Sequence, residues 1–446
     1  MAEITLAQKL FVTACAVTRS TDLAARWTGA APFLPALFVL RYANMGGLDH
    51  ALFAGQIRRA RSFRDDRWCG YWNHIAGAHA REATDLLRRL AGTDSTAVPD
   101  LTDPSTTDGL TALIAPAAAL FADHGPRADV RALTALVDEH APPADRPRIT
   151  LALRAIDAWV KAITYYQVSA FPGHDPQRMA AYWRSRHLFD ALVDALAPTL
   201  GLTVEHVDIP VAGGDTVRGY LVVPIGSGPY PVVLTTNGLE GTVQELAIPQ
   251  LRYRDSGMAM FLMEMPGSYA YTEPMSPHSE AVYHQVIDRL AADERLDADR
   301  IAMVGVSFGG YWTARLAATD DRLACAIACG APTHRSFHGG ALGTPQIILH
   351  ALAKTVGAAN PFDLMGKLKA LSIRDRYSGI AIPLLVINGD RDTLMSTQDS
   401  SDLAHGAVNA TLLLYPDDDH CAMGHYRQWL DYSQHWLHDH LQVTTN

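Results

Sequence analysis

The stretch MVGVSFGGYWTARLA, from Met303 to Ala317, places Ser307 between two glycines, where an apolar run meets a helix-forming segment. The run that ends at Gly305 is typical of a buried strand, and the residues after Gly309 are typical of a helix. A serine gains nothing from packing at such a sharp turn. In this context the pattern G-x-S-x-G is typical of a nucleophile elbow, which exposes the serine hydroxyl while the glycines let strand and helix approach. The stretch therefore predicts a nucleophilic Ser307.

A serine hydroxyl needs a base to take its proton, and on this type of fold an acid and then a histidine follow the serine along the chain. The segment IPLLVINGDRDTLMS reads as a strand followed by a polar turn, and ATLLLYPDDDHCAMGH reads as the next strand with its loop. Asp392 is the predicted acid, preferred over Asp390 because its position clears the end of the strand. His420 is the predicted base, with His425 as the alternative. The acidic run Asp417, Asp418 and Asp419 that precedes His420 is expected to be a solvated loop.

Hydrolysis through a serine also needs two backbone N–H groups that receive the negative charge on the carbonyl oxygen. One is expected from Phe308, next to the nucleophile. The other is expected from the glycine-containing loop TTNGLEG, where the Leu239 amide is the first choice and Gly238 the second. Glu240 in the same loop has two possible roles, a contact with the substrate or the capping of a helix.

The chain changes character near residue 200. Residues 1–197 show helical periodicity and almost no strand signal, whereas residues 198–446 begin with a hairpin pattern and continue with short apolar runs separated by helical segments. Apolar runs of this kind are typical of strands buried on both faces of a parallel sheet. The sequence therefore predicts an α/β domain with a mostly parallel eight-stranded sheet, preceded by an all-helical domain. The strandless interval at about 333–378 is expected to be a helical insertion.

Several segments together resemble the FrsA-like branch of the α/β-hydrolase superfamily, namely VVLTTNGLEGTVQE, MFLMEMPG, RIAMVGVSFGGYWTARLA, LVINGDRDTL and DDDHCAMGH. Within that branch the sequence is most similar to the 2,6-dihydroxypseudooxynicotine hydrolases and the fungal heptaketide hydrolases of pigment synthesis. The resemblance covers most of residues 150–440. It implies a Ser307–Asp392–His420 triad, a helical cap over the active site, cleavage of a carbon–carbon bond next to a ketone, and pairing of subunits into a homodimer. The segment NGLEG departs from the family pattern, which has a second glycine and an aspartate there.

The composition restricts the possible partners. The chain has 446 residues, 48% of them hydrophobic, and a formal net charge of −10, which argues against a nucleic-acid partner because such a partner needs a basic surface. The apolar stretch AAPFLPALFVL is too short and too interrupted by proline to span a membrane, and the N-terminal segment reads as a helix and not as a signal peptide. The five cysteines are scattered and form no metal-binding pattern. We expect a cytoplasmic enzyme that acts on a small-molecule carbonyl compound without a cofactor or a metal.

The sequence leaves the bond that breaks undecided. Cleavage of a β-diketone or aryl ketone, as in polyketide-like compounds, is the preferred hypothesis, and an esterase, a thioesterase or an acyltransferase are the alternatives with the same triad. A non-catalytic ligand receptor is the hypothesis from another class, and the presence of all three triad residues argues against it. Tyr165 and Tyr166 lie where the cap is expected to face the pocket, so either a substrate contact or a place in the core fits them.

Overall fold

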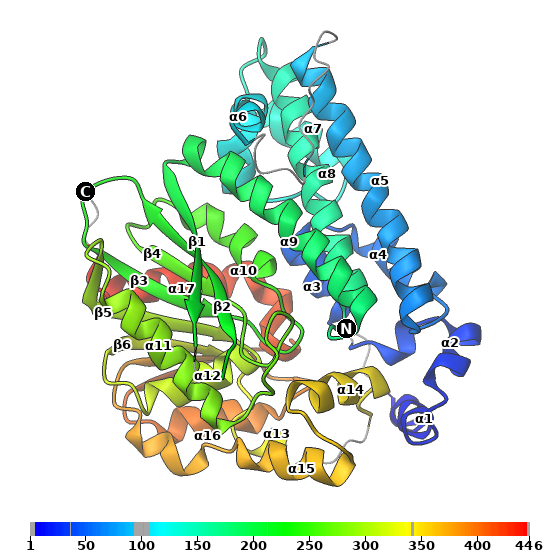
Figure 1. Cartoon of the computed structure of the whole chain (residues 1–446), viewed down its shortest axis with the longest axis vertical. Coiled ribbons are helices and arrows are strands. Elements are labelled where there is room, and N and C mark those ends of the chain that lie inside the picture. Colours follow the sequence, from blue (N-terminus) through cyan, green and yellow to red (C-terminus); the bar gives the residue numbers. More distant parts are fainter. Residues whose placement is uncertain are drawn as a thin grey trace.

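The computed structural model describes residues 5–35, 37–92, 101, 107–211, 213–339 and 343–443. Helices fill the described chain up to Leu200, and the first strand begins at Leu202. Figure 1 shows the N-terminal helices, coloured blue to green, beside a sheet that the rest of the chain forms. We call residues 5–200 the helical region and residues 202–443 the sheet region. The predicted division at residues 197 and 198 falls within the short helix η3 (Ala197–Leu200), and the independence of the two parts stays a prediction.

The sheet region contains the eight strands that the apolar runs predict. They are β1 (Leu202–Pro210), β2 (Thr216–Pro224), β3 (Tyr230–Thr236), β4 (Ala259–Met263), β5 (Leu296–Val306), β6 (Leu323–Cys329), β7 (Leu384–Gly389) and β8 (Ala410–Tyr415). Their order in the sheet is β1-β2-β4-β3-β5-β6-β7-β8, and β2 is antiparallel to both of its neighbours while the other pairs are parallel. This arrangement confirms the predicted fold class, a mostly parallel α/β-hydrolase sheet.

Helices cover both faces of this sheet, because the side chains of the central strands are apolar on both sides. One face packs against α11 (Glu280–Ala291), α12 (Phe308–Ala317) and α16 (Thr397–Gly406). The other face packs against α17 (Tyr426–His440), α10 (Val243–Gln250) and α9 (Pro176–Leu196). Since the carboxyl ends of parallel strands share one edge, the loops after β3, β5, β7 and β8 are brought together there.

The helical region is built around one long buried helix. Its elements are α1 (Leu6–Val17), α2 (Thr21–Thr28), η1 (Ala31–Phe33), α3 (Phe38–Gly46), α4 (His50–Arg59), α5 (Asp65–Ala91), α6 (Thr107–His124), α7 (Val130–His140), α8 (Arg146–Ala170) and α9. Helix α8 packs against α5, α6 and α9, and its side chains are buried along most of its length. Two indole N–H groups fix this packing: Trp68 donates to the carbonyl of Val168 and Trp159 to that of Leu188.

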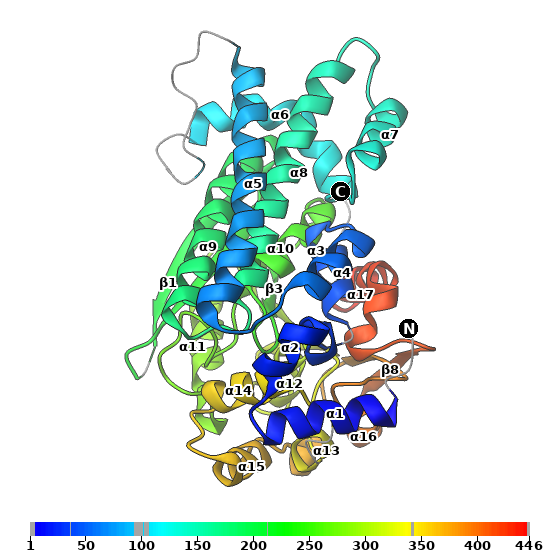
Figure 2. The same ribbon diagram turned by 90° about the vertical axis from the view of Figure 1, so that its right-hand side faces the viewer.

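The predicted insertion at 333–378 contains helices and no strand among its described residues. Its elements are α13 (Arg335–His338), α14 (Gln346–Thr355), α15 (Pro361–Ala370) and η6 (Arg374–Gly379). Figure 2 shows α1 alongside these helices, and the Gly343 amide donates a 2.8 Å hydrogen bond to the Thr13 hydroxyl. Helix α1 itself begins with a capping box, in which the Thr5 and Gln8 side chains each accept from the other residue's backbone amide.

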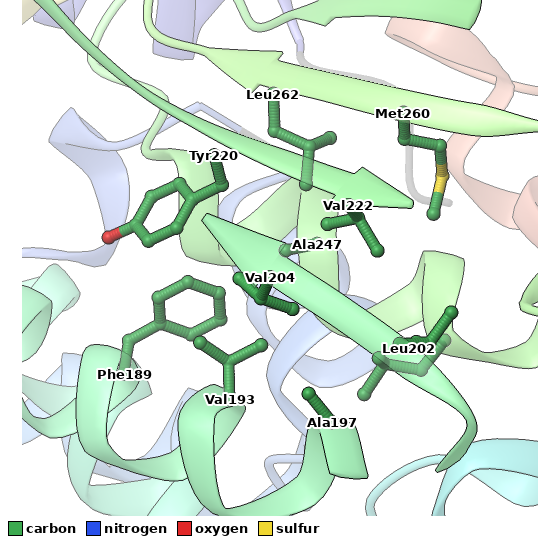
Figure 3. Close-up of a pocket in the computed structure, with 11 residues that line it drawn as sticks. Phe189, Val193, Ala197, Leu202, Val204, Tyr220, Val222, Ala247, Met260 and Leu262 are labelled. Atoms are coloured by element: carbon green, nitrogen blue, oxygen red, sulfur yellow. The ribbon is translucent and has the colours of Figure 1, made fainter. Parts of the chain in front are cut away.

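The cysteines belong to the interior of the molecule. All five are buried and free, and Cys325 and Cys329 lie in strand β6 of the sheet. None of the described helices combines the length and the apolar character that a membrane crossing requires. A cavity of about 20 Å³ lies between α9, α10 and the strands β1, β2 and β4, and Figure 3 shows side chains that line it. Its lining is entirely apolar, and it contains none of the predicted catalytic residues.

Candidate active site

The strand-to-helix turn at Ser307 has the strained geometry that the G-x-S-x-G pattern predicts. Ser307 lies between β5 and α12 and has φ 59° and ψ −120°, a region that non-glycine residues rarely occupy. Strain of this kind costs about 1–3 kcal/mol and persists only where the surroundings hold it. The glycines explain how it is held: a Cβ on Gly305 would lie 2.0 Å from the Gly309 carbonyl oxygen, and one on Gly309 would lie 2.4 Å from that of Thr236.

The three side chains predicted to act together form one chain of hydrogen bonds. The Nε2 atom of His420 lies 2.8 Å from the Ser307 hydroxyl, and its Nδ1 atom lies 2.7 Å from Oδ2 of Asp392. The side chain of Asp392 is completely buried, and that of His420 is 5% exposed. A serine in such a chain can lose its proton to the imidazole, while the carboxylate holds the ring in orientation and stabilises the imidazolium.

The charges of this pair depend on each other. Burial disfavours the Asp392 carboxylate, but His420 and hydrogen bonds from the Met395 amide and the Asn388 side chain stabilise it, so the pKa of Asp392 lies below 3.8. Burial also disfavours the imidazolium of His420, yet the adjacent carboxylate outweighs that effect and raises the pKa of His420 well above 6.5. Asp392 is therefore ionised at neutral pH, and His420 is a stronger base than free histidine.

The alternative acid and base do not contact Ser307. Asp390 is exposed at the surface. His425 is turned to another carboxylate, with its Nδ1 atom 2.8 Å from Oδ2 of Asp418. The residue run Asp417–Asp419, which we expected to be a solvated loop, is solvated only at Asp417. The expectation is wrong for Asp418 and Asp419, which are buried because they accept hydrogen bonds from the backbone that shapes the His420 loop.

The loop after β3 passes directly beside the serine. A Cβ on Gly238 would lie 2.6 Å from the Cβ atom and 3.1 Å from the hydroxyl oxygen of Ser307. A hydrogen bond of 3.0 Å from the Gly241 amide to the Gly238 carbonyl closes the loop into a turn. Within the described part of the chain, the amides of Phe308 and Leu239 have no hydrogen-bond partner. Both groups are therefore available to a ligand oxygen near Ser307.

Of the two roles that the sequence suggested for Glu240, the capping of a helix is wrong, and the contact with the substrate stays a prediction. Helix α10 begins at Val243 with Thr242 as its N-cap, so Glu240 does not cap it. Its carboxylate is buried and accepts a hydrogen bond of 2.5 Å from the Gly173 amide, in the connection between α8 and α9. The carboxylate is thus engaged by the helical region, and this contact joins segments that no sequence pattern links.

The two tyrosines lie in different surroundings. Tyr165 is 2% exposed and packs among Phe53, Trp72 and His79, with its hydroxyl donating to Gln56 at 2.7 Å. It therefore belongs to the core of the helical region, the second of the two roles considered for it. Tyr166 is partly exposed and packs at the junction of three apolar clusters.

One residue of the site escaped the sequence reasoning. Asn388, at the end of β7, donates to Oδ2 of Asp392 at 3.0 Å and accepts from the Cys421 amide at 2.9 Å. It thus joins the segment that carries the acid to the loop that carries the base. The sequence does contain a sign of this role. Asn388 is the polar residue near the end of the apolar strand LLVING, and the amide of a buried asparagine requires several hydrogen-bond partners.

Comparison with known protein families identifies the group to which this site belongs. The family described as Esterase FrsA-like matches residues 150–442. The chain belongs to this family. The chain is also similar to Hydrolase LUC6 from Fusarium sp, at 29% identity over 347 residues that cover 65% of this chain and 77% of that protein. Esterase FrsA from Escherichia fergusonii is 26% identical over 273 residues, or 58% of this chain and 64% of that protein. Esterase FrsA from Enterobacter sp. (strain 638) is 24% identical over 226 residues, so the alignments span about half to two thirds of the FrsA esterases.

Solved structures support the same fold. The 2,6-dihydroxy-pseudo-oxynicotine hydrolase superposes with a TM-score of 0.64 at 20% identity, over 90% of this chain and 95% of that chain. AbyA5 superposes with a TM-score of 0.57 at 21% identity, over 73% of this chain and 93% of that chain. The first likeness extends into the helical region. The FrsA-like protein is therefore a hydrolase with an α/β-hydrolase sheet and N-terminal helices. Among the described residues no group of three or more His, Cys, Asp or Glu side chains could hold a metal ion.

The elbow predicts unequal effects for two Gly→Ala substitutions. Gly305→Ala places a methyl group against the backbone of Gly309, which cannot move without displacing Ser307, and we expect the free energy of unfolding to fall by about 3 kcal/mol. Gly366→Ala is the matched control, because Gly366 lies in exposed α15 with open space around it, and we expect a gain of about 0.5–1 kcal/mol. Urea denaturation followed by tryptophan fluorescence measures both. Equal stabilities for the two variants would contradict the packing described for the elbow.

Proposed function

We propose that this FrsA-like protein is a serine hydrolase in which Ser307 attacks the carbonyl carbon of a small-molecule substrate. The observation that carries the proposal is the unbroken hydrogen-bonded chain from the Ser307 hydroxyl through His420 to the buried Asp392. A serine at a strained elbow, a histidine within 2.8 Å and an ionised, buried carboxylate form a combination that has no structural purpose of its own.

The proposed reaction runs in two halves. In the first, His420 accepts the proton of Ser307 as its oxygen attacks the carbonyl carbon, and the amides of Phe308 and Leu239 donate hydrogen bonds to the resulting oxyanion. The oxyanion then collapses, the bond to the leaving group breaks, and His420 gives its proton to that group. In the second half, His420 takes a proton from water while the water oxygen attacks the acyl-serine. The bond from the acyl carbon to the Ser307 oxygen then breaks, His420 returns its proton to that oxygen, and a carboxylic acid leaves.

We further propose that the leaving group is a carbon atom, as in a β-diketone or an aryl ketone with a polyketide-like skeleton. Such a group leaves as an enolate, which has to be protonated at once, and this step favours a histidine that is shielded from water. The nearly complete burial of His420 and the contact of the helical region with its loop support this idea, since Asn44 of α3 donates to the Met423 carbonyl at 2.7 Å. The solved hydrolase of 2,6-dihydroxy-pseudo-oxynicotine has a similar fold that includes the helices.

Ester hydrolysis is the second candidate. The family is described as Esterase FrsA-like, and two of the relatives bear the name esterase. The first half of the reaction is the same for an ester, and only the atom that receives the proton of His420 differs.

The nucleophile can be tested directly. We expect Ser307→Ala to lower turnover by about 10³- to 10⁶-fold while the substrate still binds, because the members of a triad act as a unit. Labelling with a fluorophosphonate, followed by mass spectrometry of the tryptic peptides, is expected to modify Ser307 in the unchanged protein and to leave the variant unmodified. Modification of another serine, or near-normal turnover of Ser307→Ala, would place the nucleophile elsewhere.

The electrostatics of His420 predict a shift in the pH profile. Only the neutral imidazole can accept the serine proton, so activity falls as the pH drops through the pKa of His420. Since Asp392 raises that pKa well above 6.5, we expect the acidic limb of kcat/KM to lie above 6.5. Asp392→Asn removes the negative charge beside His420, so burial then lowers the pKa of His420. We expect the acidic limb of the variant's pH profile to move to lower pH, and its rate to fall by about 10⁴-fold. If the acidic limb of kcat/KM stays at the same pH in Asp392→Asn, the Asp392 carboxylate does not cause the raised pKa of His420.

A matched panel of substrates distinguishes the two leaving groups. β-Diketones and acyl-phenol ketones are compared with esters and thioesters that carry the same acyl group, and the products are identified by mass spectrometry. We expect cleavage of the ketones with water added to the acyl fragment. Turnover of the esters with none of the ketones would support the esterase, and acyl groups joined to an added alcohol would support an acyltransferase.

A further inference from the structure

The conformation of Glu240 connects the oxyanion loop to the helical region. Glu240 directly follows Leu239 and has φ 54°, in the left-handed region that residues with side chains rarely adopt. Its side chain reaches the connection between α8 and α9. A strained backbone at a non-glycine residue persists only where contacts hold it, so the contacts of Glu240 show what the loop depends on.

The side chain of Glu240 is held entirely by the helical region. Its Oε2 atom accepts from the Gly173 amide, whereas its Oε1 atom lies 3.2 Å from Nε2 of His174 without forming a hydrogen bond to it. The connection that supplies these groups is itself fixed, because the guanidinium of Arg178 donates to the Phe171 carbonyl and pairs with Asp65 at 2.6 Å. The carboxylate is completely buried, so losing these partners would leave an uncompensated buried charge.

The backbone of Glu240 is held as well. Its carbonyl oxygen accepts from Nη2 of Arg41 at 3.0 Å and from the Tyr269 hydroxyl at 3.2 Å. Arg41 belongs to α3 and is locked by a two-fold ion pair with Glu245, in which both N···O distances are 2.7 Å. The residue after Leu239 is thus fixed at three points, and two of them come from the helical region.

We infer that Glu240 is a positioning residue that sets the Leu239 amide in the oxyanion site, so that the seating of the helical region controls the rate of the chemical step. This inference rests on the proposed serine mechanism. A donor to an oxyanion acts at about 2.7–3.1 Å, and a displacement of about 1 Å can cost about 100-fold in rate. The helical region then contributes to catalysis through the loop, in addition to any contact with the substrate.

Two substitutions of Glu240 separate the tether from the backbone turn. Glu240→Gly keeps the left-handed conformation available but removes the carboxylate, whereas Glu240→Gln keeps an acceptor for the Gly173 amide. The readouts are the second-order rate of fluorophosphonate attachment to Ser307, and kcat and KM for 4-nitrophenyl acetate. We expect Glu240→Gly to lower both the attachment rate and kcat by about 100-fold, while KM changes by less than about 3-fold. We expect Glu240→Gln to keep both rates within about 10-fold of those of the unchanged protein. The acidic limb of the pH profile is expected to stay in place, because His420 is untouched.

A double-mutant cycle tests whether the contacts act through the same loop. Tyr269→Phe removes one hydrogen bond to the Glu240 carbonyl, and we expect a several-fold loss of attachment rate in the unchanged protein but little further loss in Glu240→Gly. The control is Ser185→Ala. It breaks a buried hydrogen bond of 3.1 Å between α9 and Gln244, at the same interface but outside the loop, and should leave the attachment rate within about 2-fold.

The outcomes separate the positioning role from the serine mechanism. If Ser307→Ala abolishes labelling while Glu240→Gly labels at the normal rate, the positioning role is wrong and the serine mechanism stands. If Glu240→Gly and Ser185→Ala lose rate equally, the interface acts only through stability, and the positioning role is again wrong. If fluorophosphonate does not modify Ser307 in the unchanged protein, both proposals are wrong.

Discussion

The left-handed backbone of Ser307 is the constraint on which the rest of the site depends. It exists because Gly305 lets β5 approach α12, and Gly309 lets α12 approach the end of β3, to distances that any side chain would prevent. The strain has a cost, and the buried packing of α12 against the sheet offsets it. The loops after β3, β7 and β8 leave the sheet at the same edge as Ser307, so their residues lie next to it. The positions of His420, Asp392 and Gly238 follow from that geometry.

The site combines rigidity with balanced charge. Asp392 is buried and ionised because its oxygens accept from backbone amides, from Asn388 and from His420. Asp418 and Asp419 are buried for a different purpose, since they bind the amides of the loop that carries His420. The acidic residues around the histidine are therefore divided between one that acts on its charge and two that act on its position.

The sequence predicted the parts of the fold that depend on local pattern. All eight strands, the elbow and the three hydrogen-bonded side chains could be found because apolar periodicity and the order serine, acid, histidine are visible along the chain. The contacts of Glu240 with Gly173 and Arg41 could not be found, because they join residues about 67 and 199 positions apart by backbone turns that leave no pattern. The burial of Asp418 and Asp419 was missed for a related reason: an acidic run looks solvated until the amides that it binds are placed in space.

The contact between α1 and the insertion has a consequence for how the molecule is made. The Thr13 hydroxyl accepts from the Gly343 amide, which is 330 positions further along the chain, and α14 packs against α1. A ribosome that has translated α1 must add strands β1 to β6 before the partner of that helix exists. The cluster of Val12 and Cys15, by contrast, is completed by residues close in the chain, namely Ala25 of α2 and Phe33 of η1 with Phe63 packed against them. Helix α1 can therefore dock against α14 only after more than three quarters of the described chain has been made.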